Sequence, residues 1–173
     1  MKNKFVLIAS HAESVINFRR NLINDLQCNS MDVHVLIPRL YSIDNDAIRK
    51  KIEAIGVTIH EVHLNRTGLK LILDFIAFMH IVITLWKIKP DYVLAYTIKS
   101  VIWSGISSRF FKINFYGLVT GLGFSFQGKS FKRRVLTSLV VFLYKLALKN
   151  SKAVIFQNKD NRNIFIEKKI IEP

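Results

Sequence analysis

The feature that most constrains this sequence is a regular alternation of short apolar runs with longer segments of helical periodicity. Six apolar runs have the length and composition of strands, and they occupy residues 5–10, 32–38, 57–64, 91–96, 113–119 and 153–157. Helical patterns lie between and after them, at residues 14–26, 44–55, 69–88, 98–110, 129–149 and 160–168. This alternation predicts an α/β fold, a Rossmann-like doubly wound parallel sheet of about six strands with helices on both faces.

The length of the chain suits a single domain. Its 173 residues, half of them apolar, are enough to bury a core, and neither a linker nor an internal repeat divides residues 1–173. The single cysteine, Cys28, excludes an internal disulfide framework and fits a reducing, cytoplasmic compartment. The first apolar run is too short for a signal peptide, so we expect it to be a buried strand.

Several enzyme classes lack their motifs in this sequence. It contains no G-x-x-x-x-G-K-[ST] loop and no G-x-G-x-x-G after the first strand, which argues against a P-loop NTPase and a nicotinamide-binding domain. The five histidines are scattered, so we expect no metal site. Ser10 and His11 combine a hydroxyl with an imidazole at the end of a strand, but no acidic partner can be named for a hydrolase triad.

The charge of the chain is unevenly distributed. The formal net charge is +14, and no Asp or Glu occurs between Tyr92 and Lys159. That stretch holds eleven basic residues: Lys99, Arg109, Lys112, Lys129, Lys132, Arg133, Arg134, Lys145, Lys149, Lys152 and Lys159. Such a field attracts anionic lipid, phosphorylated ligands or nucleic acid, and the alternative is a solvated basic face. Because no nucleic-acid-binding motif is present, we expect no nucleic acid partner, and a basic nucleic-acid-binding module remains the weakest alternative.

Two long helical segments are unusually apolar. Residues 71–86 are interrupted only by Asp74, His80 and Thr84, and these polar positions argue against a membrane span. We therefore expect this helix to be buried in the α/β core.

The second long segment, residues 129–149, is amphipathic. Its basic side carries Arg134, Ser138, Lys145 and Lys149, opposite Leu136, Leu139, Val140 and Leu143. Basic residues beside aromatic ones suit the surface of an anionic bilayer, and the alternative is a core-facing helix with a solvated basic side. The predicted membrane contacts are Lys129, Phe131, Lys132, Arg133, Arg134, Lys145 and Lys149.

The loops after the strands are the expected place for a ligand. In doubly wound sheets ligands bind outside the carboxyl ends of the strands, near the point where the strand order reverses. The loops concerned here are residues 10–13, 97–99, 120–128 and 158–160. The third contains Gly121 and Gly123, whose spacing lets the backbone approach a ligand, although such a turn is a weak signal alone.

Five segments carry a resemblance to a known family. They are Asn17-Phe18-Arg19, the stretch LNRTG at 64–68, the stretch KPDYVLAYTIKS at 89–100, the stretch TGLGF at 120–124 and the stretch AVIFQNKD at 153–160. In this order they resemble the N-terminal domain of family-four retaining glycosyltransferases of the GT-B fold. The likeness is to bacterial enzymes that build capsular polysaccharide, exopolysaccharide or O-antigen on a lipid carrier.

The resemblance implies that this domain holds the acceptor and faces part of the donor sugar. It places these residues at the cleft: Ser10, His11, Ser14, Arg19, Thr97, Lys99, Thr120, Gly121, Gly123, Gln157 and Asn158. Arg19 would orient the first loop or meet a phosphate, and Lys99 would pair with an acceptor diphosphate. Gln157 and Asn158 have an alternative role as caps of the following helix. The catalytic residues are not identified by the resemblance.

Two departures from the family pattern matter. Many members have glycines in the first loop, where this chain has Ser10-His11-Ala12-Glu13, so the usual approach of a donor phosphate there is in doubt. The second domain, which in the family binds most of the nucleotide-sugar donor, is expected outside this chain, either as a C-terminal domain or as a separate chain. No other cofactor and no metal are expected.

The implied activity is retaining transfer of a sugar from a nucleotide sugar to a lipid-linked, polyprenyl-diphosphate glycan acceptor. The enzyme would be peripheral on the inner face of the cell membrane, and the isolated chain would be inactive because transfer takes place between the two domains. The alternative is a non-catalytic subunit that recruits the donor-binding chain of a split glycosyltransferase to the membrane.

Overall fold

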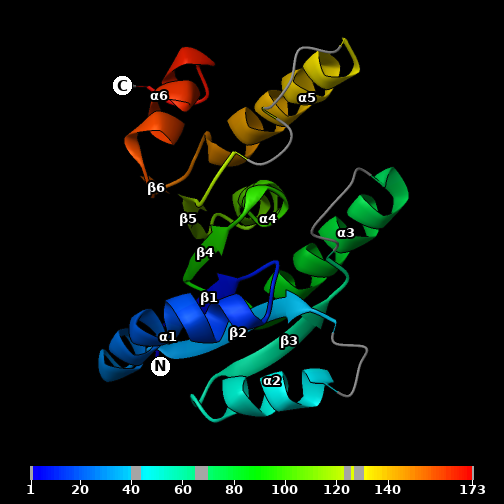
Figure 1. Cartoon of the computed structure of the whole chain (residues 1–173). Coiled ribbons are helices and arrows are strands. Elements are labelled where there is room, and N and C mark those ends of the chain that lie inside the picture. Colours follow the sequence, from blue (N-terminus) through cyan, green and yellow to red (C-terminus); the bar gives the residue numbers. More distant parts are fainter. Residues whose placement is uncertain (1, 40–43, 65–69, 123–125, 127–130, 173) are drawn as a thin grey trace.

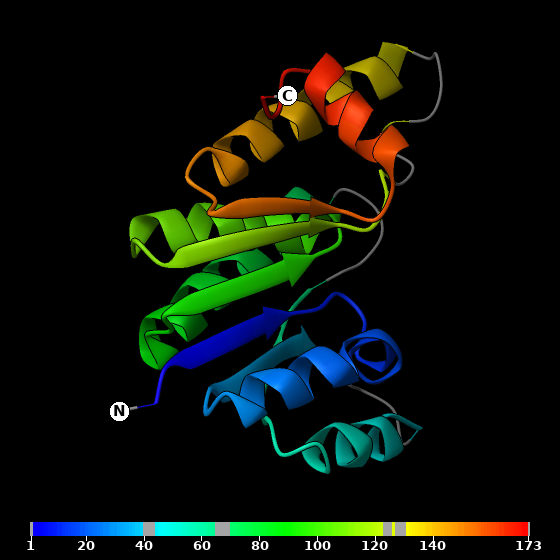
Figure 2. The same ribbon diagram turned by 90° about the vertical axis from the view of Figure 1, so that its left-hand side faces the viewer.

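The strands form one parallel sheet. The structure, a computed structural model, describes residues 2–39, 44–64, 70–122, 126 and 131–172. Within these residues six strands are arranged in the order β3-β2-β1-β4-β5-β6, and all point the same way (Figure 2). Their bounds are β1 (Lys4–Ile8), β2 (Asp32–Pro38), β3 (Thr58–Val62), β4 (Tyr92–Tyr96), β5 (Asn114–Val119) and β6 (Ala153–Phe156). The order reverses between β1 and β4, which makes this pair the switch point of the sheet.

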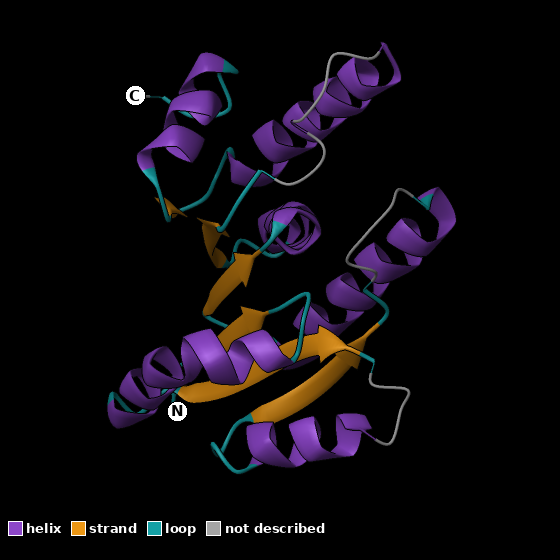
Figure 3. Cartoon of the chain, in the orientation of Figure 1, coloured by secondary structure: helices purple, strands orange, loops and turns teal. Residues whose placement is uncertain are grey.

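The helices alternate with the strands and cover both faces of the sheet. Their bounds are α1 (Glu13–Cys28), α2 (Asp44–Glu53), α3 (Leu71–Ile88), α4 (Ile98–Phe110), α5 (Phe131–Leu148) and α6 (Lys159–Glu167). Helices α1 and α2 lie on one face, α3, α4 and α5 lie on the other, and α6 lies beside α5 beyond β6 (Figures 1 and 3). The predicted doubly wound fold is confirmed, and each element ends within two residues of its predicted bounds.

The two faces of the sheet have separate cores because successive strand residues point in opposite directions. In β1, Phe5 and Leu7 belong to the core under α1, whereas Val6 and Ile8 belong to the core under α3, α4 and α5. Strands that are buried on both faces read as continuous apolar runs, which explains why the sequence pattern was clear.

Helix α4 packs closely against α5. A Cβ atom added to Gly105 would lie 2.6 Å from the carbonyl oxygen of Ala147, so only glycine fits at this contact. Four serines of α4 are also buried, and small side chains allow the two helix backbones to approach: Ser100, Ser104, Ser107 and Ser108.

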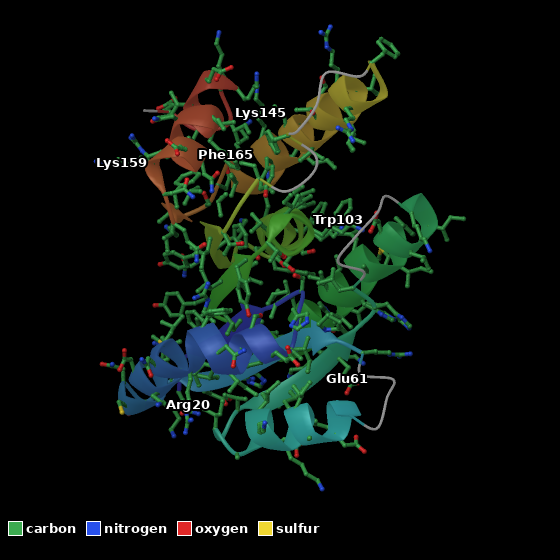
Figure 4. The ribbon with its side chains drawn as sticks, viewed as in Figure 1. Arg20, Glu61, Trp103, Lys145, Lys159 and Phe165 are labelled. Carbon is green, nitrogen blue, oxygen red and sulfur yellow. The ribbon has the colours of Figure 1, made fainter. Side chains whose placement is uncertain are left out.

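The structure corrects the expectation that the helix over residues 71–86 is buried. One side of α3 packs inward through Ala77, Ile81 and Leu85, but the opposite side is exposed. On the inner side Lys99 of α4 donates to Asp74 at 2.6 Å, and Phe78 lies 5.6 Å from the ring of Trp103, which extends from α4 toward α3 (Figure 4). Among the described residues, no helix has both the length and the apolar content needed to cross a membrane.

Candidate functional site

A pocket opens at the carboxyl ends of the strands, beside the switch point between β1 and β4. Its volume is about 420 Å³. The lining residues come from the loop after β1, from α1 and from the ends of β4, β5 and β6: Ser10, His11, Glu13, Ser14, Asn17, Phe18, Arg19, Tyr96, Thr97, Thr120 and Gln157. Segments far apart in the sequence thus meet where this class of fold binds its ligands.

Ser14 joins the first loop to the end of β4. Its hydroxyl donates to the carbonyl oxygen of His11 at 2.5 Å and lies 2.7 Å from the Tyr96 hydroxyl. Burial raises the pKa of Tyr96 above its ordinary value of 10.0, against the smaller opposing effects of the Ser14 hydrogen bond and the nearby Arg19 charge. The phenol therefore stays protonated at neutral pH and can donate as well as accept.

Arg19 supplies the positive charge of the pocket. The carbon of its guanidinium lies 4.8 Å from the centre of the Tyr96 ring, a cation–π geometry, and its Nη1 donates to the Phe18 carbonyl oxygen at 2.9 Å. Its Nε is buried without a hydrogen-bond partner among the described residues. A buried N–H group without a partner is uncommon, and the guanidinium has further N–H donors besides the one that is bonded to Phe18.

Thr97 is held in a strained conformation at the start of α4. Its φ of 73° and ψ of 153° lie in a region that is essentially reserved for glycine and costs about 1–3 kcal/mol. Its hydroxyl donates to Ser10 Oγ at 2.8 Å, which fixes the first loop against β4. Strain of this kind is concentrated at ligand sites, and here it lies in the wall of the pocket.

The structure brings together most of the residues predicted at the cleft. Those that line the pocket are Ser10, His11, Ser14, Arg19, Thr97, Thr120 and Gln157. Gly121 lies next to Thr120, and among the described residues other than its chain neighbours no atom lies within 4 Å of a Cβ placed on it. Gly123 lies outside the described residues.

Lys99 and Asn158 lie elsewhere. The ammonium group of Lys99 is paired with Asp74, and their side chains are only 14% and 5% exposed, so this lysine faces α3. The Asn158 side chain accepts from the Asn161 backbone N–H at 2.8 Å and caps α6, which is the alternative role considered for it.

Three lining residues lie outside both the predicted site and the predicted ligand loops, namely Asn17, Phe18 and Tyr96, whereas Glu13 belongs to the predicted loop of residues 10–13. Asn17 and Phe18 follow Ser14 at helical spacing, so a predicted Ser14 contact could have pointed to the next turn of α1. Tyr96 is the last residue of β4, immediately before the predicted Thr97.

The basic side of α5 is exposed as expected. Arg134, Lys145 and Lys149 are exposed and Phe131 is 79% exposed, whereas Arg133 is half-buried. Lys129 and the side chain of Lys132 lie outside the described residues. Lys145 points from α5 toward α6 (Figure 4) and borders a second, larger pocket of about 780 Å³ between these helices. Within the described ranges no group of three or more metal-ligating side chains occurs.

Solved structures with the same fold include sugar-transferring and sugar-epimerising enzymes. A glycosyltransferase from Rickettsia africae is 13% identical with a TM-score of 0.65, and the match covers 99% of this chain and 41% of that one. A putative UDP-N-acetylglucosamine 2-epimerase from Listeria monocytogenes is 11% identical with a TM-score of 0.62, and the match covers 98% of this chain and 43% of that one. Acinetobacter baumannii MurG is 12% identical with a TM-score of 0.53, and the match covers 90% of this chain and 41% of that one. At these identities the likeness shows the fold, that of one half of a GT-B enzyme.

The chain spans about two fifths of the length of these solved structures. No protein of curated function matches the sequence. Residues 4–158 match the glycosyl transferase 4-like family, and that range includes every residue that lines the switch-point pocket. The chain therefore belongs to the glycosyl transferase 4-like family.

Proposed function

We propose that this chain is the acceptor-binding half of a glycosyltransferase. The complete enzyme transfers a sugar, with retention of anomeric configuration, from a nucleotide sugar to a polyprenyl-diphosphate-linked glycan in the synthesis of bacterial surface polysaccharide, such as capsule or O-antigen. The observation that carries the proposal is the switch-point pocket, which lies inside the family match and presents hydroxyl, amide and guanidinium groups at the carboxyl ends of four strands.

The chemistry of the pocket suits a sugar that carries a phosphate. Sugar hydroxyls both donate and accept, and the side chains of Thr120 and Gln157 do the same. Arg19 lines the pocket and brings its guanidinium charge to an anion. Because Lys99 is already paired with Asp74, we assign the acceptor phosphate to Arg19 rather than to Lys99.

The proposal places the nucleotide-sugar donor mainly on a second domain or a separate chain. The whole-length structures of this fold are more than twice as long as the present chain, which supports that division of labour. Sugar transfer takes place between the two halves, where positioning and electrostatic stabilisation of the leaving diphosphate lower the barrier. The isolated chain is therefore inactive, and no metal or further cofactor is assigned to it.

The proposed location is the inner surface of the cell membrane. The acceptor carries a lipid, and the exposed cations of α5, Arg134, Lys145 and Lys149, are suited to anionic headgroups. The rival assignment is a subunit without a catalytic role that brings a donor-binding chain to the membrane. It differs from the proposal in needing no sugar in the switch-point pocket.

Binding of a short-chain polyprenyl diphosphate that carries one sugar tests the proposal by calorimetry. Arg19→Gln is expected to weaken binding by about tenfold to a hundredfold, because a charge-assisted hydrogen bond contributes about 1.5–3 kcal/mol. Arg20→Gln is the matched control, since Arg20 is the next residue of α1, is exposed and lies outside the pocket. Equal binding by the wild type and the Arg19 variant would contradict the assignment of the pocket.

A further inference from the structure

Exposed apolar side chains are concentrated on two helices. Thirteen large hydrophobic residues in the described part of the chain are exposed, and ten of them belong to α3 or α5. On α3 they are Ile72, Leu73, Phe75, Ile76, Ile83 and Trp86, and on α5 they are Phe131, Val135, Leu139 and Phe142. Where such side chains lie together along one helix, the apolar surface that they form marks an interaction site rather than ordinary protein surface.

The exposed residues of α3 form a stripe along one side of the helix. Ile72, Ile76, Ile83 and Trp86 follow at intervals of four, seven and three residues, which returns to the same side of a helix with 3.6 residues per turn. Phe75 lies beside them and is 62% exposed. This stripe is opposite the inward side that packs on the sheet, so α3 is apolar on both sides although only one of them is covered.

The single acid of α3 is directed away from this stripe. Asp74 lies in the contact with α4, where it accepts from Lys99. Burial of this pair leaves the outward side of α3 without a negative charge. The exposed lysines near α3 are at its ends, with Lys70 before the first turn and Lys87 and Lys89 at the last. Lysines at the ends of an apolar stripe suit a helix that lies at a membrane surface.

Charge decides between a lipid surface and a second copy of this chain as the occupant. From Val62 to Lys159 the only acids are Asp74 and Asp91, and Asp74 is neutralised by Lys99. Two copies that met through α3 and α5 would bring two strongly basic surfaces together, which is unfavourable. Anionic headgroups supply the opposite charge, and acyl chains accept the apolar side chains.

We propose that α3 is an interfacial membrane helix, whose outward stripe enters the headgroup region of an anionic bilayer. The inference extends the membrane association proposed under "Proposed function" from the basic side of α5 to a second helix. The N-terminal ends of α3 and α5 project from the same side of the molecule (Figure 1). Helix α3 lies along the surface with its apolar side about 5–10 Å deep, and Trp86 anchors its C-terminal end.

Tryptophan fluorescence tests this placement directly. The chain has two tryptophans, Trp86, which is 59% exposed, and Trp103, whose Nε1 is buried without a partner among the described residues. Trp103→Phe therefore removes an unsatisfied N–H and leaves Trp86 as the only reporter. With vesicles of phosphatidylcholine and phosphatidylglycerol, we expect its emission to shift to shorter wavelength and to be quenched by lipids brominated on the acyl chain. Vesicle binding without either change would overturn the role of α3.

Two variants distinguish vesicle binding through α3 from non-specific binding through any exposed apolar residue. Phe75→Ser with Trp86→Ser is expected to weaken vesicle partition by about tenfold or more, since each side chain loses a large apolar contact with lipid. The control is Ile155→Thr, because Ile155 is exposed on β6 and pairs in register with Leu118, whose core lies on the α1 side of the sheet. Equal loss in both variants would contradict a site on α3.

The remaining outcomes separate this inference from the proposed enzyme. We expect the α3 variant to bind both neutral and anionic vesicles less tightly than the wild type. We expect Arg134→Gln and Lys145→Gln to weaken binding to anionic vesicles only. Together these results would support an apolar role for α3 and an electrostatic role for α5. No partition of the wild type into any vesicle would overturn the membrane placement, whereas binding of the acceptor analogue in the pocket would be unaffected. A dimer in sedimentation that is abolished by the α3 variant, without vesicle binding, would assign the stripe to a second copy instead.

Discussion

The two helical layers on this sheet differ in the surface that they present outward. On α1 and α2 the described exposed positions are almost all polar or charged, and Phe18, which lines the pocket, is the exception among large side chains. On α3 and α5 the outward positions include ten large apolar side chains. Both layers cover well-packed cores, so the difference does not come from a defect in packing.

This difference shows that the residues on the inner and outer sides of a helix are determined by different contacts. Burial against the sheet requires one apolar side. Helix α1 has only that apolar side, and its outward side is polar and suited to water. Helix α3 continues with apolar residues on its free side, which adds nothing to the packing of this domain. The apolar outward side of α3 is therefore explained by contact with something outside this domain and not by the stability of the fold.

The largest expected effect comes from the ion pair inside the α3 layer. Asp74→Ala leaves Lys99 mostly buried without its partner and is expected to lower the free energy of unfolding by about 3–5 kcal/mol. The corresponding pair in the α2 layer is Arg49–Glu53, whose side chains are 45% and 52% exposed, and Glu53→Ala is expected to cost about 0.5 kcal/mol or less. Urea unfolding of both variants measures the two losses of unfolding free energy. Similar losses would contradict the difference between a buried ion pair under α3 and an exposed one on α2.

The contact between α4 and α5 gives the next largest effect. Gly105→Ala forces a methyl group against Ala147 and Phe115, so the free energy of unfolding is expected to fall by about 1–3 kcal/mol. Gly121→Ala introduces the same methyl group where none of the described residues beyond its chain neighbours lies within 4 Å, and it should leave the melting temperature unchanged. Equal melting temperatures for the two variants would contradict the close contact between α4 and α5.

A smaller effect, of opposite sign, is expected inside α4. The Ser104 hydroxyl is buried without a partner among the described residues, whereas the Ser107 hydroxyl donates to the Trp103 carbonyl oxygen at 2.7 Å. Ser104→Ala is expected to raise the free energy of unfolding by up to about 1 kcal/mol, because it removes an unsatisfied polar group and improves helix propensity. Ser107→Ala should gain less. A clear loss of stability in the Ser104 variant would show that its hydroxyl has a partner.

The smallest effect concerns the histidines of β2 and β3. Burial, and to a lesser degree the adjacent His34, lower the pKa of His60 below 6.5, and His34 Nδ1 lies 3.0 Å from His60 Nε2. A lowered pKa in the folded state means that the unfolded chain binds more protons, so the contribution of neutral His60 is complete above pH 6.5 and is lost as the pH falls below it. Melting at pH 7.5 and 5.5 should show a smaller pH dependence in His60→Asn than in the wild type.

The sheet and much of the pocket could be predicted from the sequence because both depend on local patterns. Strands buried on two faces are visible as apolar runs, and the polar residues just after them, such as Ser10, Thr97 and Thr120, must gather at one edge of a parallel sheet. Arg19 came from the family resemblance and lies in the pocket wall.

The remainder depends on contacts that no local pattern reveals. Lys99 reads as a free cation near the cleft, and only the fold shows that Asp74, twenty-five residues earlier, lies against it. Helix α3 was expected to be buried because an apolar segment reads the same when one side is covered as when both are. The position of Tyr96 under Arg19 likewise depends on how α1 crosses the end of the sheet.

The first turn of α4 connects the two regions that are assigned to the acceptor. Thr97 lines the pocket, and Lys99, two residues later, is held by Asp74 on α3, next to the exposed Phe75. Two residues of helix, a rise of about 3 Å, separate Thr97 from Lys99, and the width of α3 lies between Asp74 and the outward stripe. On the proposed function, the carrier reaches from a sugar seated in the pocket, past the Lys99–Asp74 contact, to the outward side of α3. The acceptor then presents its sugar for reaction while its tail stays in the leaflet, and no part of the carrier has to be pulled into water.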